Sequence, residues 1–493
     1  MKNTISLLLF YFLLLVGAGC NKEKSELPNI VLILADDLGT GDVGAYNPAS
    51  GIPTPNMDRI AKEGIMFSDA HTGSAVCTPT RYGIITGRYC WRTRLKRGVL
   101  NGYGEHLIEA GRTTISSLLR EKGYYTAGIG KWHLGMDFAK DSSGTVDYYG
   151  KINFSPITNG FDYFYGIAAS LDFPPYVYIE NDHFTMIPAE EQEKLGFPRY
   201  LRKGPKASDF DFETAWEHLT HKAKTVIGKQ SGKNPLFLYF ALPSPHKPVW
   251  PDSRFVGQTK LGPYGDFVHQ TDHIIGEVVS ALEKGGILDN TLLILTSDNG
   301  SFMYRINDTI PADHLIDERV QGYYTANHQS NFYYRGTKAD IWEAGHRVPF
   351  LVQWPGRIGK GKTIDETICT TDFMATFAEI IDRDLADNEG EDSFSILPLL
   401  FGYINNFSRA PVVNHSSAGM FAIRDGSYKL IAGNGSGGRQ HPRGKPWGEP
   451  FMLYDLSSDL SETEDIIEEN EDLAEDMRNT LERIIESGSS KNY

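Results

Sequence analysis

Short, almost wholly apolar runs separated by longer amphipathic segments most strongly constrain the fold of this chain. The run 29–34 precedes Asp36 and Asp37, and its continuous apolar character predicts a buried parallel strand. Similar apolar runs that predict further strands follow at 236–242, 292–296 and 348–354. Two segments have helical spacing and predict helices: 114–122 and 268–284. This alternation predicts an α/β fold, a mixed sheet sandwiched by helices, with functional residues at the carboxyl ends of its strands.

After about residue 380 the pattern changes. The segment 421–431 alternates around Asp425-Gly426, which is typical of a hairpin, and 451–456 predicts another short strand. Four apolar residues then have helical spacing: Leu473, Met477, Leu481 and Ile484. We therefore expect a small antiparallel sheet with a terminal helix. Between them, the glycine-rich segment 433–438 predicts a flexible loop, because no helix opens after it to form a phosphate site.

The first residues have the features of an export signal. Lys2 is followed by an apolar stretch and by small residues up to Gly19, and the apolar stretch is too short to span a bilayer comfortably. Two outcomes stay open: lipidation of Cys20 as in a bacterial lipoprotein, or plain cleavage and release. The sequence thus predicts a protein exported to the bacterial periplasm or cell surface, with membrane contact only through a lipid anchor. The predicted regions are a signal peptide at 1–19, a tether at 20–28, a large domain at 29–380 and a C-terminal subdomain at 381–493.

The net charge of −15 argues against general binding to nucleic acid, which needs a basic surface. It does not exclude an anionic small molecule, because a pocket can be basic on an acidic protein. The chain has 4 cysteines, Cys20, Cys77, Cys90 and Cys369. Cys90 and Cys369 either pair in an oxidising compartment or remain as inert buried thiols, and the sequence leaves both open.

The segment Cys77-Thr78-Pro79-Thr80-Arg81 carries the most chemical information, although an isolated cysteine of this kind is often only a small core residue. Five further motifs accompany it: Ala35-Asp36-Asp37-Leu38-Gly39, Gly130-Lys131-Trp132-His133-Leu134-Gly135, Pro243-Ser244-Pro245-His246-Lys247-Pro248, Ser297-Asp298-Asn299-Gly300, and Gly336-Thr337-Lys338 with Glu343-Ala344-Gly345. Together they resemble type I sulfatases, the arylsulfatase-like enzymes that include bacterial polysaccharide sulfatases, over most of 29–380. The resemblance implies a catalytic domain with an alkaline-phosphatase-like fold. Ala344 is a mild departure from the family's usual glycine.

The resemblance also implies how the nucleophile is made. In type I sulfatases the cysteine matched here by Cys77 is oxidised to 3-oxoalanine (formylglycine), an aldehyde whose hydrate attacks sulfur. That conversion requires a partner, either a formylglycine-generating enzyme or an anaerobic sulfatase-maturating enzyme. The sequence thereby predicts a sulfuric ester hydrolase that acts by covalent catalysis.

Two pairs of polar residues after buried strands predict a metal site. Asp36, Asp37, Asp298 and Asn299 offer only oxygen ligands, which suit a hard cation such as Ca²⁺ and do not suit zinc. The resemblance adds the modified Cys77 to this ligand set. The ion would polarise a sulfate oxygen and orient the nucleophile.

Preorganised donors are expected around a sulfate that gains charge during the reaction. The resemblance nominates five residues for catalysis besides Cys77: Arg81, Lys131, His133, His246 and Lys338. It implies that Arg81 steadies residue 77 and that His133 takes a proton from the hydrate. Either His246 or Lys338 would protonate the leaving alcohol.

The substrate is predicted to be a sulfated oligo- or polysaccharide, such as a glycosaminoglycan, mucin or algal polysaccharide such as ulvan. Ser170 lies after a segment that resembles a family stretch ending near a sulfate contact. Arg94, in the basic run 92–97, and Arg335, at the end of the aromatic stretch 323–335, are the types of residue that suit charged sugars. These three residues are the predicted substrate contacts.

Three alternatives remain at this level. A phosphatase or phosphonate hydrolase of the alkaline phosphatase superfamily would share the sheet, but most such enzymes use Ser or Thr as nucleophile. A small-molecule arylsulfatase would use the same core site. A binding protein that keeps the fold would not need nucleophile, cations and metal ligands together.

Overall fold

The computed structural model describes residues 27–306 and 321–491, so the predicted signal peptide at 1–19 and Cys20 lie outside the described residues. Within the described residues, the largest sheet has 10 strands in the order β15-β2-β14-β11-β1-β10-β4-β5-β6-β7. Their bounds are β1 (Asn29–Asp36), β2 (Ile65–Phe67), β4 (Tyr125–Lys131), β5 (Tyr163–Ile167), β6 (Ile179–Glu180), β7 (His183–Phe184), β10 (Leu236–Pro245), β11 (Thr291–Ser297), β14 (Phe350–Gln353) and β15 (Lys362–Ile364).

The middle of this sheet is parallel. Strands β11, β1, β10, β4 and β5 run in one direction, with Ile30 opposite Leu292 on one side and Phe237 on the other. Strand β14 pairs antiparallel with β11 and β2, which makes the sheet mixed, as predicted. Residues Ile30 to Leu34 are fully buried because both faces of the sheet are covered.

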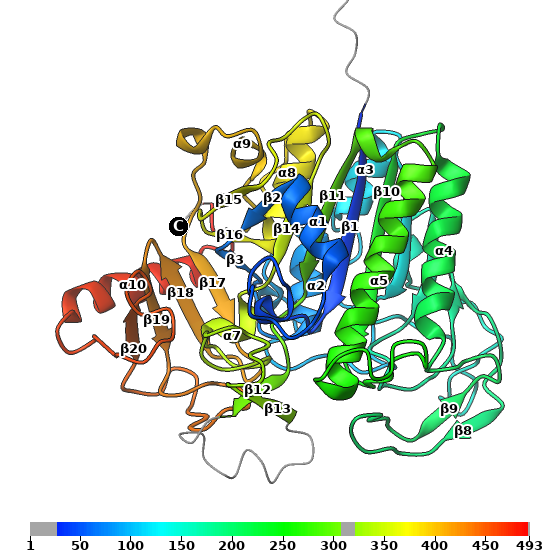
Figure 1. Ribbon diagram of the computed structural model, residues 1–493, viewed down its shortest axis with the longest axis horizontal. Coiled ribbons are helices and arrows are strands. Elements are labelled where there is room, and N and C mark those ends of the chain that lie inside the picture. The colour runs from blue at the N-terminus through cyan, green and yellow to red at the C-terminus, as the bar shows by residue number, and fades with distance from the viewer. Residues whose placement is uncertain (1–26, 307–320, 492–493) are drawn as a thin grey trace, which may run out of the picture.

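Helices cover the two faces of the sheet in two groups (Figure 1). Helices α4 and α5 pack on each other and α1 packs on α5, whereas α2, α3 and α8 contact one another. Their bounds are α1 (Pro55–Glu63), α4 (Ala215–Gln230), α5 (Gly262–Lys284), α2 (Cys77–Thr86), α3 (Ile115–Glu121) and α8 (Phe373–Ile380). Helices α3 and α5 are the two predicted from spacing, and the Thr114 side chain caps α3 by accepting a hydrogen bond from the Ser117 N–H.

The parallel direction of the central strands brings their carboxyl ends to one edge. Strand β1 ends at Asp36, β4 at Lys131 and β11 at Ser297, directly before Asp298. Side chains from three distant parts of the chain therefore meet at this edge.

A second, antiparallel sheet lies beside the large one and carries helix α10 (Figure 1). Its strands are β17 (Val412–His415), β18 (Phe421–Asp425), β19 (Tyr428–Ala432) and β20 (Met452–Asp455), and α10 spans Glu471–Glu486. Met477, Leu481 and Ile484 pack on the sheet, and Leu473 lies at the margin of this core. The predicted small sheet with a terminal helix is therefore confirmed. The remaining short elements are β3 (Ala70–His71), β8 (Glu190–Gln192), β9 (Gly204–Lys206), β12 (Met303–Ile306), β13 (Gln321–Tyr324), β16 (Ile368–Cys369), α7 (Glu343–His346) and α9 (Leu397–Leu400).

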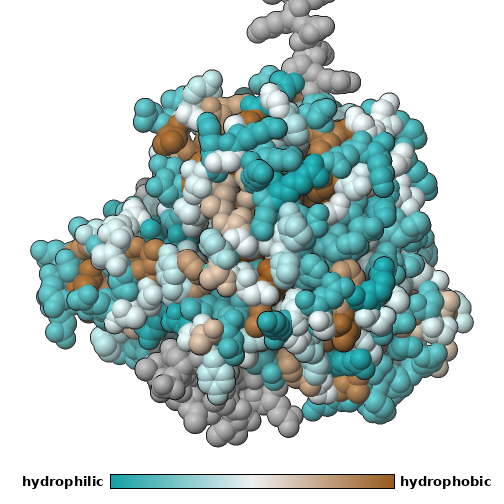
Figure 2. Space-filling view, viewed as in Figure 1, coloured by the Kyte–Doolittle hydropathy of each residue, from teal (hydrophilic) through white to brown (hydrophobic). Residues whose placement is uncertain are grey.

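The face in Figure 2 is mainly hydrophilic, with hydrophobic residues in small separate patches. No helix within 27–306 or 321–491 combines the length and apolar character needed to cross a membrane. Cys77, Cys90 and Cys369 are all buried free thiols. Of the two alternatives for Cys90 and Cys369, the structure therefore has the unpaired one.

Candidate active site

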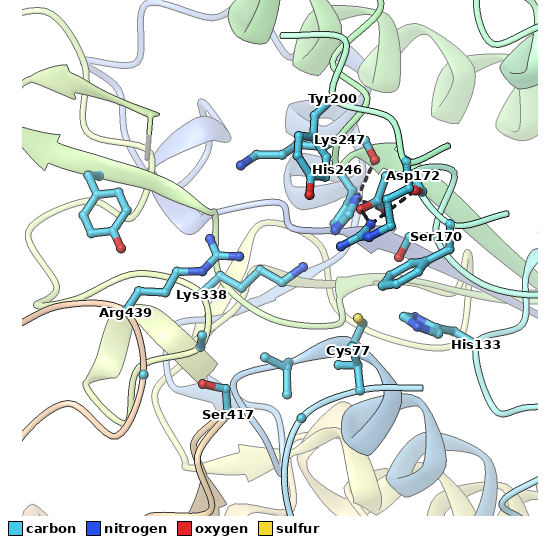
Figure 3. A pocket seen from close by; sticks show the side chains of 18 of the residues that line it. Cys77, His133, Ser170, Asp172, Tyr200, His246, Lys247, Lys338, Ser417 and Arg439 are labelled. Carbon is cyan, nitrogen blue, oxygen red and sulfur yellow. Dashed lines mark hydrogen bonds and ion pairs between the residues drawn. The ribbon is translucent and has the colours of Figure 1, made fainter. Parts of the chain in front are cut away.

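A cavity of about 620 Å³ opens at the carboxyl edge of the large sheet and contains Cys77. Figure 3 shows Cys77 and His133 close together, with Lys338 and Arg439 on one side and Ser170, Asp172 and His246 on another. The described residues lining it are Val76, Cys77, Gly98, Val99, His133, Ser170, Asp172, Phe173, Tyr200, Arg202, His246, Lys247, Tyr304, Lys338, Ala339, Ser417, Gly438, Arg439, His441 and Arg443.

Cys77 is the first residue of helix α2, at the end where backbone N–H groups point outward. A helix N-terminus favours negative charge, so this position suits an anionic ligand and an oxyanion on residue 77. Burial raises the pKa of the Cys77 thiol, more than nearby Lys131 and Lys338 lower it. An unmodified Cys77 is therefore a protonated thiol at neutral pH and a weak nucleophile.

Beneath Cys77, two carboxylates are held by buried cations. The Lys131 ammonium donates to Asp36 Oδ2 at 2.6 Å, and Arg81 donates to Asp298 Oδ2 at 2.8 Å. Arg81 also donates to the Lys131 carbonyl at 3.0 Å. Because Arg81 lies one turn after Cys77 on α2, these bonds fix the helix against Asp298 and the end of β4. Arg81 and Lys131 are thus brought to the site, although neither lines the cavity.

A third buried carboxylate, Asp37, is also held by a cation. The Lys338 ammonium donates to Asp37 Oδ1 at 2.5 Å, and the Asn299 amide donates to the same oxygen at 2.6 Å. These bonds and Lys338 hold the pKa of Asp37 well below its usual range despite burial. Asp37, His133 and Ala339 have φ of 66°, 59° and 83°, a left-handed conformation that is costly for non-glycine residues. Such strain at three positions is typical of a functional site.

The oxygen cluster fits a hard cation. Three buried oxygens have no hydrogen-bond partner within the described chain: Asp36 Oδ1, Asp37 Oδ2 and Asn299 Oδ1. One ligand atom each from Asp36, Cys77 and Asp298 lie within 4.8 Å of one another, and so do those of Asp36, Asp37 and His246. Unpartnered buried oxygens are costly unless a cation or water satisfies them. The predicted ligands are therefore brought together with free acceptor atoms.

Both predicted histidines line the cavity in a defined tautomer. His133 Nε2 lies 2.8 Å from the Leu100 carbonyl and donates to it, which leaves Nδ1 as a lone pair without a partner among the described residues. Burial, followed by Lys131, lowers the pKa of His133 well below its usual value. His246 Nδ1 donates to the Lys247 carbonyl at 2.6 Å, and burial lowers the pKa of His246 to about 3. Neutral His133 can therefore accept a proton at Nδ1.

Ser170 and Asp172 form the wall beside His246. The Ser170 hydroxyl and Asp172 Oδ1 are buried and have no hydrogen-bond partner in the described structure. Asp172 Oδ2 pairs with Arg202, whose guanidinium also lies 3.8 Å from the Phe173 ring centroid. Ser170 is therefore placed where the sequence predicts, next to a carboxylate that sequence reasoning missed.

The other two predicted substrate contacts are not brought to the cavity. Arg94 donates to the carbonyls of Glu105 and His106 at 2.7 and 2.9 Å, in a separate surface hollow. Arg335 donates to the Glu462 carbonyl at 2.6 Å and lies 3.7 Å from the Trp342 ring centroid. Both guanidinium groups are engaged elsewhere, and neither arginine lines the cavity.

The basic run 92–97 and the aromatic stretch 323–335 also have other roles. Arg92 pairs with buried Asp392 at 2.8 Å and Lys96 donates to the Trp91 carbonyl. The Tyr323 hydroxyl donates to the Leu261 carbonyl. None of the described residues of either segment lines the cavity. Besides Lys338 and the two histidines, the aromatic and basic lining comes from Phe173, Tyr200, Arg202, Lys247, Tyr304 and the loop after β19. Of these five side chains, only Lys247 lies in a motif that resembles the family.

A model of the sulfatase family matches residues 28–382, which is most of the chain. With the cavity described above, this match shows that the chain belongs to the sulfatase family and is a sulfuric ester hydrolase. The chain is 31% identical to an N-acetylgalactosamine-6-O-sulfatase of Bacteroides thetaiotaomicron, over 98% of this chain and 99% of that protein. The predicted family and enzyme class are confirmed.

Solved structures agree with this assignment. A Bacteroides thetaiotaomicron protein, described with the metabolism of multiple glycosaminoglycans, has a TM-score of 0.81 and 30% identity, covering 93% of this chain and 99% of its own. A phosphonate monoester hydrolase of Agrobacterium radiobacter has a TM-score of 0.59 and 16% identity, covering 94% and 96% of the two chains. The second likeness shows the fold alone, and it supports the predicted alkaline-phosphatase-like architecture.

Proposed function

We propose that this enzyme removes sulfate from a sulfated glycan, with Cys77 converted to formylglycine and with Ca²⁺ bound by Asp36, Asp37, Asp298, Asn299 and residue 77. One observation carries the proposal. Cys77 lies at a helix N-terminus, inside the cavity, against a cluster of buried oxygens without partners and against Lys338 and His246. A cysteine that only fills space in the core would not need these groups around it.

Bound Ca²⁺ would supply positive charge that polarises a sulfate oxygen and holds the nucleophile in line. One hydroxyl of the residue 77 hydrate gives its proton to a carboxylate beside it, Asp36 or Asp298, and its oxygen attacks sulfur as the bond from sulfur to the sugar oxygen breaks. The leaving sugar oxygen takes a proton from the Lys338 ammonium, which lines the cavity and whose pKa is raised by Asp37 despite burial. Neutral His246 carries its ring proton on Nδ1, bonded to the Lys247 carbonyl, and so has none to give. This step leaves sulfate on residue 77.

The second step returns the aldehyde. His133 Nδ1 takes the proton of the remaining hydroxyl, and the electron pair forms the carbonyl as the bond from carbon to the sulfate oxygen breaks. The hydrogen bond from His133 Nε2 to the Leu100 carbonyl fixes the tautomer that this step needs. Water then adds to the aldehyde and restores the hydrate.

Three features favour a glycan over a small aryl sulfate. The Asp172 and Ser170 oxygens that lack partners are acceptors for sugar hydroxyl groups beside the sulfate. Phe173, Tyr200 and Tyr304 line the cavity and offer apolar surface to a sugar ring. The relative described above acts on N-acetylgalactosamine 6-sulfate groups, which makes a glycosaminoglycan or mucin fragment the first substrate to test.

The compartment and the maturation partner belong to the same proposal. The apolar segment before Cys20 supports export to the bacterial periplasm or cell surface, either released or held by a lipid on Cys20. A formylglycine-generating enzyme or an anaerobic sulfatase-maturating enzyme would convert Cys77 before activity begins.

The test is Cys77→Ser, with Cys90→Ser as a matched control because Cys90 is also a buried free thiol but lies outside the cavity lining. We expect no turnover by Cys77→Ser, since a serine cannot regenerate an aldehyde, and normal turnover by the control. Sulfate release is measured on N-acetylgalactosamine 6-sulfate, on its oligosaccharides and on nitrophenyl sulfate, with peptide mass spectrometry of residue 77. Near-normal turnover by Cys77→Ser would refute the formylglycine mechanism, and a preference for nitrophenyl sulfate would refute the glycan assignment.

A further inference from the structure

The loop between β19 and β20, residues 433–451, reaches from the small sheet into the catalytic cavity, and we name it the C-terminal loop. Four of its residues line the cavity: Gly438, Arg439, His441 and Arg443. Figure 3 shows Arg439 on the same side of the cavity as Lys338. The segment 433–438, predicted from sequence to be a flexible loop, is therefore part of the site.

Buried contacts hold this loop in place. The backbone N–H groups of Arg439 and Gln440 both donate to Asp340, a fully buried carboxylate two residues after Lys338. The Ile341 N–H donates to the Ser436 carbonyl at 2.7 Å. A Cβ on Gly438 would lie 2.3 Å from the Ala339 carbonyl oxygen, so the two backbones are in close contact. The position of Arg439 is thus tied to that of Lys338.

The lining of the cavity is strongly cationic on a protein whose net charge is −15. Asp172 is its single described carboxylate, whereas its described lysines and arginines are Arg202, Lys247, Lys338, Arg439 and Arg443. Arg202 pairs with Asp172, and Lys338 pairs with Asp37. For the guanidinium groups of Arg439 and Arg443, the described chain provides neither an ion pair nor a hydrogen bond.

Arg439 is close enough to another cation to affect its titration. Burial, followed by the charge of Arg439, lowers the pKa of Lys247 to about 7. Like charges gathered in a partly buried cavity repel each other, and a bound anion would offset that repulsion. One sulfate ester already has Lys338, the His246 ring and the cation that the oxygen cluster would hold beside residue 77, so the C-terminal loop adds positive charge beyond what one sulfate requires.

We propose that Arg439 and Arg443 form a subsite for a second negative charge on the glycan, a carboxylate or sulfate on the sugar next to the one that loses its sulfate. This inference rests on the proposed function and narrows its substrate to an oligosaccharide with more than one acidic group. The planar guanidinium binds either anion through two parallel hydrogen bonds, which a lysine cannot do.

The test compares four substrates that differ only beside the reacting sugar. They are N-acetylgalactosamine 6-sulfate alone, its disaccharide with a uronate, the same disaccharide with the carboxyl group reduced to an alcohol, and a disaccharide that carries a sulfate in place of the carboxyl group. We expect the wild-type enzyme to cleave the two anionic disaccharides at least roughly tenfold better, in kcat/KM, than the reduced one, because a hydrogen-bonded ion pair is worth that factor. The two anionic disaccharides show whether carboxylate or sulfate is preferred.

Arg439→Ala and Arg443→Ala should remove most of this advantage and leave the monosaccharide within about twofold of wild type. Arg94→Ala is the matched control, because Arg94 is an exposed arginine outside the cavity lining. If the loop variants lost activity equally on all four substrates, or on none, the subsite would be refuted while the sulfatase assignment stood. If wild type released sulfate from none of the four, the proposed function and the subsite would both be overturned.

Discussion

Lys429→Met should lower the free energy of unfolding, because it removes the cation from a buried group of charged residues. Lys429 lies on β19 and is fully buried, with its ammonium 3.0 Å from Glu343 Oε1 and 2.7 Å from Glu462 Oε1. Glu343 begins the helix α7 that follows the Lys338 motif, so this cation joins the small sheet to the catalytic region. A methionine fills similar volume and leaves two carboxylates facing each other.

One of those carboxylates must then take a proton. Even beside Lys429, burial raises the pKa of Glu462 to about 7, whereas Lys429 and its neighbours hold the pKa of Glu343 well below its usual range. Because a carboxyl group with a pKa of about 7 is already about half protonated at pH 7, completing its protonation adds little to the cost. The main cost comes from the lost ion pair, because removing one partner of a buried ion pair costs about 3 to 5 kcal/mol. We therefore expect the free energy of unfolding to fall by about 3 to 4 kcal/mol at pH 7.

The pH dependence separates this charge effect from lost packing. In the wild type Glu462 loses its proton above about pH 7, whereas in the variant its pKa is raised further, so the folded variant keeps a proton that the unfolded chain has released. The stability of the variant therefore goes on decreasing above pH 7 while that of the wild type levels off, and the loss should be about 1 to 2 kcal/mol larger at pH 9 than at pH 7, from about 1.4 kcal/mol per pH unit.

The assay is denaturant unfolding at pH 7 and pH 9 for wild type, Lys429→Met and the double variant with Glu462→Gln. The glutamine keeps an oxygen to accept the Glu343 N–H and offers its amide to the remaining carboxylate, so the double variant should regain most of the stability lost at pH 7. Equal losses at the two pH values, or no recovery in the double variant, would show that repulsion between the carboxylates is not the cause.

Two further predictions concern metal and pH. Chelation of Ca²⁺ should abolish activity but leave the protein folded, because Lys131, Arg81 and Lys338 already pair with Asp36, Asp298 and Asp37. The melting temperature should rise with added Ca²⁺ by mass action. Unfolding on chelation at 25 °C, or zinc in active enzyme, would contradict this. Burial lowers the pKa of four histidines: His133, His346, His246 (to about 3) and His415 (to about 4). The unfolded chain therefore binds more protons than the folded protein below about pH 6.5. We expect wild-type stability to decrease from pH 7 to pH 5. Asp340 and Glu462, whose pKa values burial raises to about 6 and about 7, act in the opposite sense, and so do Asp272, Asp298 and Asp372, whose pKa values are also raised. A denaturation midpoint higher at pH 5 than at pH 7 would show that these carboxyl groups outweigh the histidines.

Sequence reasoning predicted the large sheet and the centre of the site because both depend on local patterns. A strand buried on both faces must be apolar along its length, as β1 and β11 are, and the residue after such a strand lies at the carboxyl edge. Asp36, Cys77, His133 and Lys338 each lie inside a contiguous motif, and the resemblance of these motifs to type I sulfatases was enough to find them. The direction of β14 was not readable, since a buried strand has the same composition in either direction.

The outer part of the site could not be predicted in the same way. The direction of a long side chain depends on its tertiary neighbours, and Arg335, only three residues before Lys338, turns to Trp342 and the Glu462 carbonyl. Arg439 is a hundred residues away from the motif it adjoins, on a loop with no periodic pattern. Its position depends on two backbone hydrogen bonds to Asp340, which no local signal reveals.

The buried centre of the site and its outer part differ in how readily their residues can be replaced. The carboxylates around residue 77 are fully buried and paired with Lys131, Arg81 and Lys338, so a substitution there leaves an uncompensated buried charge. Arg439 and Arg443 are on a loop whose fixed contacts are backbone contacts, and their side chains are more exposed. Replacing them changes which anions the cavity accepts without removing a partner from the buried network. Specificity can therefore vary through the small sheet while the sulfate chemistry at the edge of the large sheet stays constant.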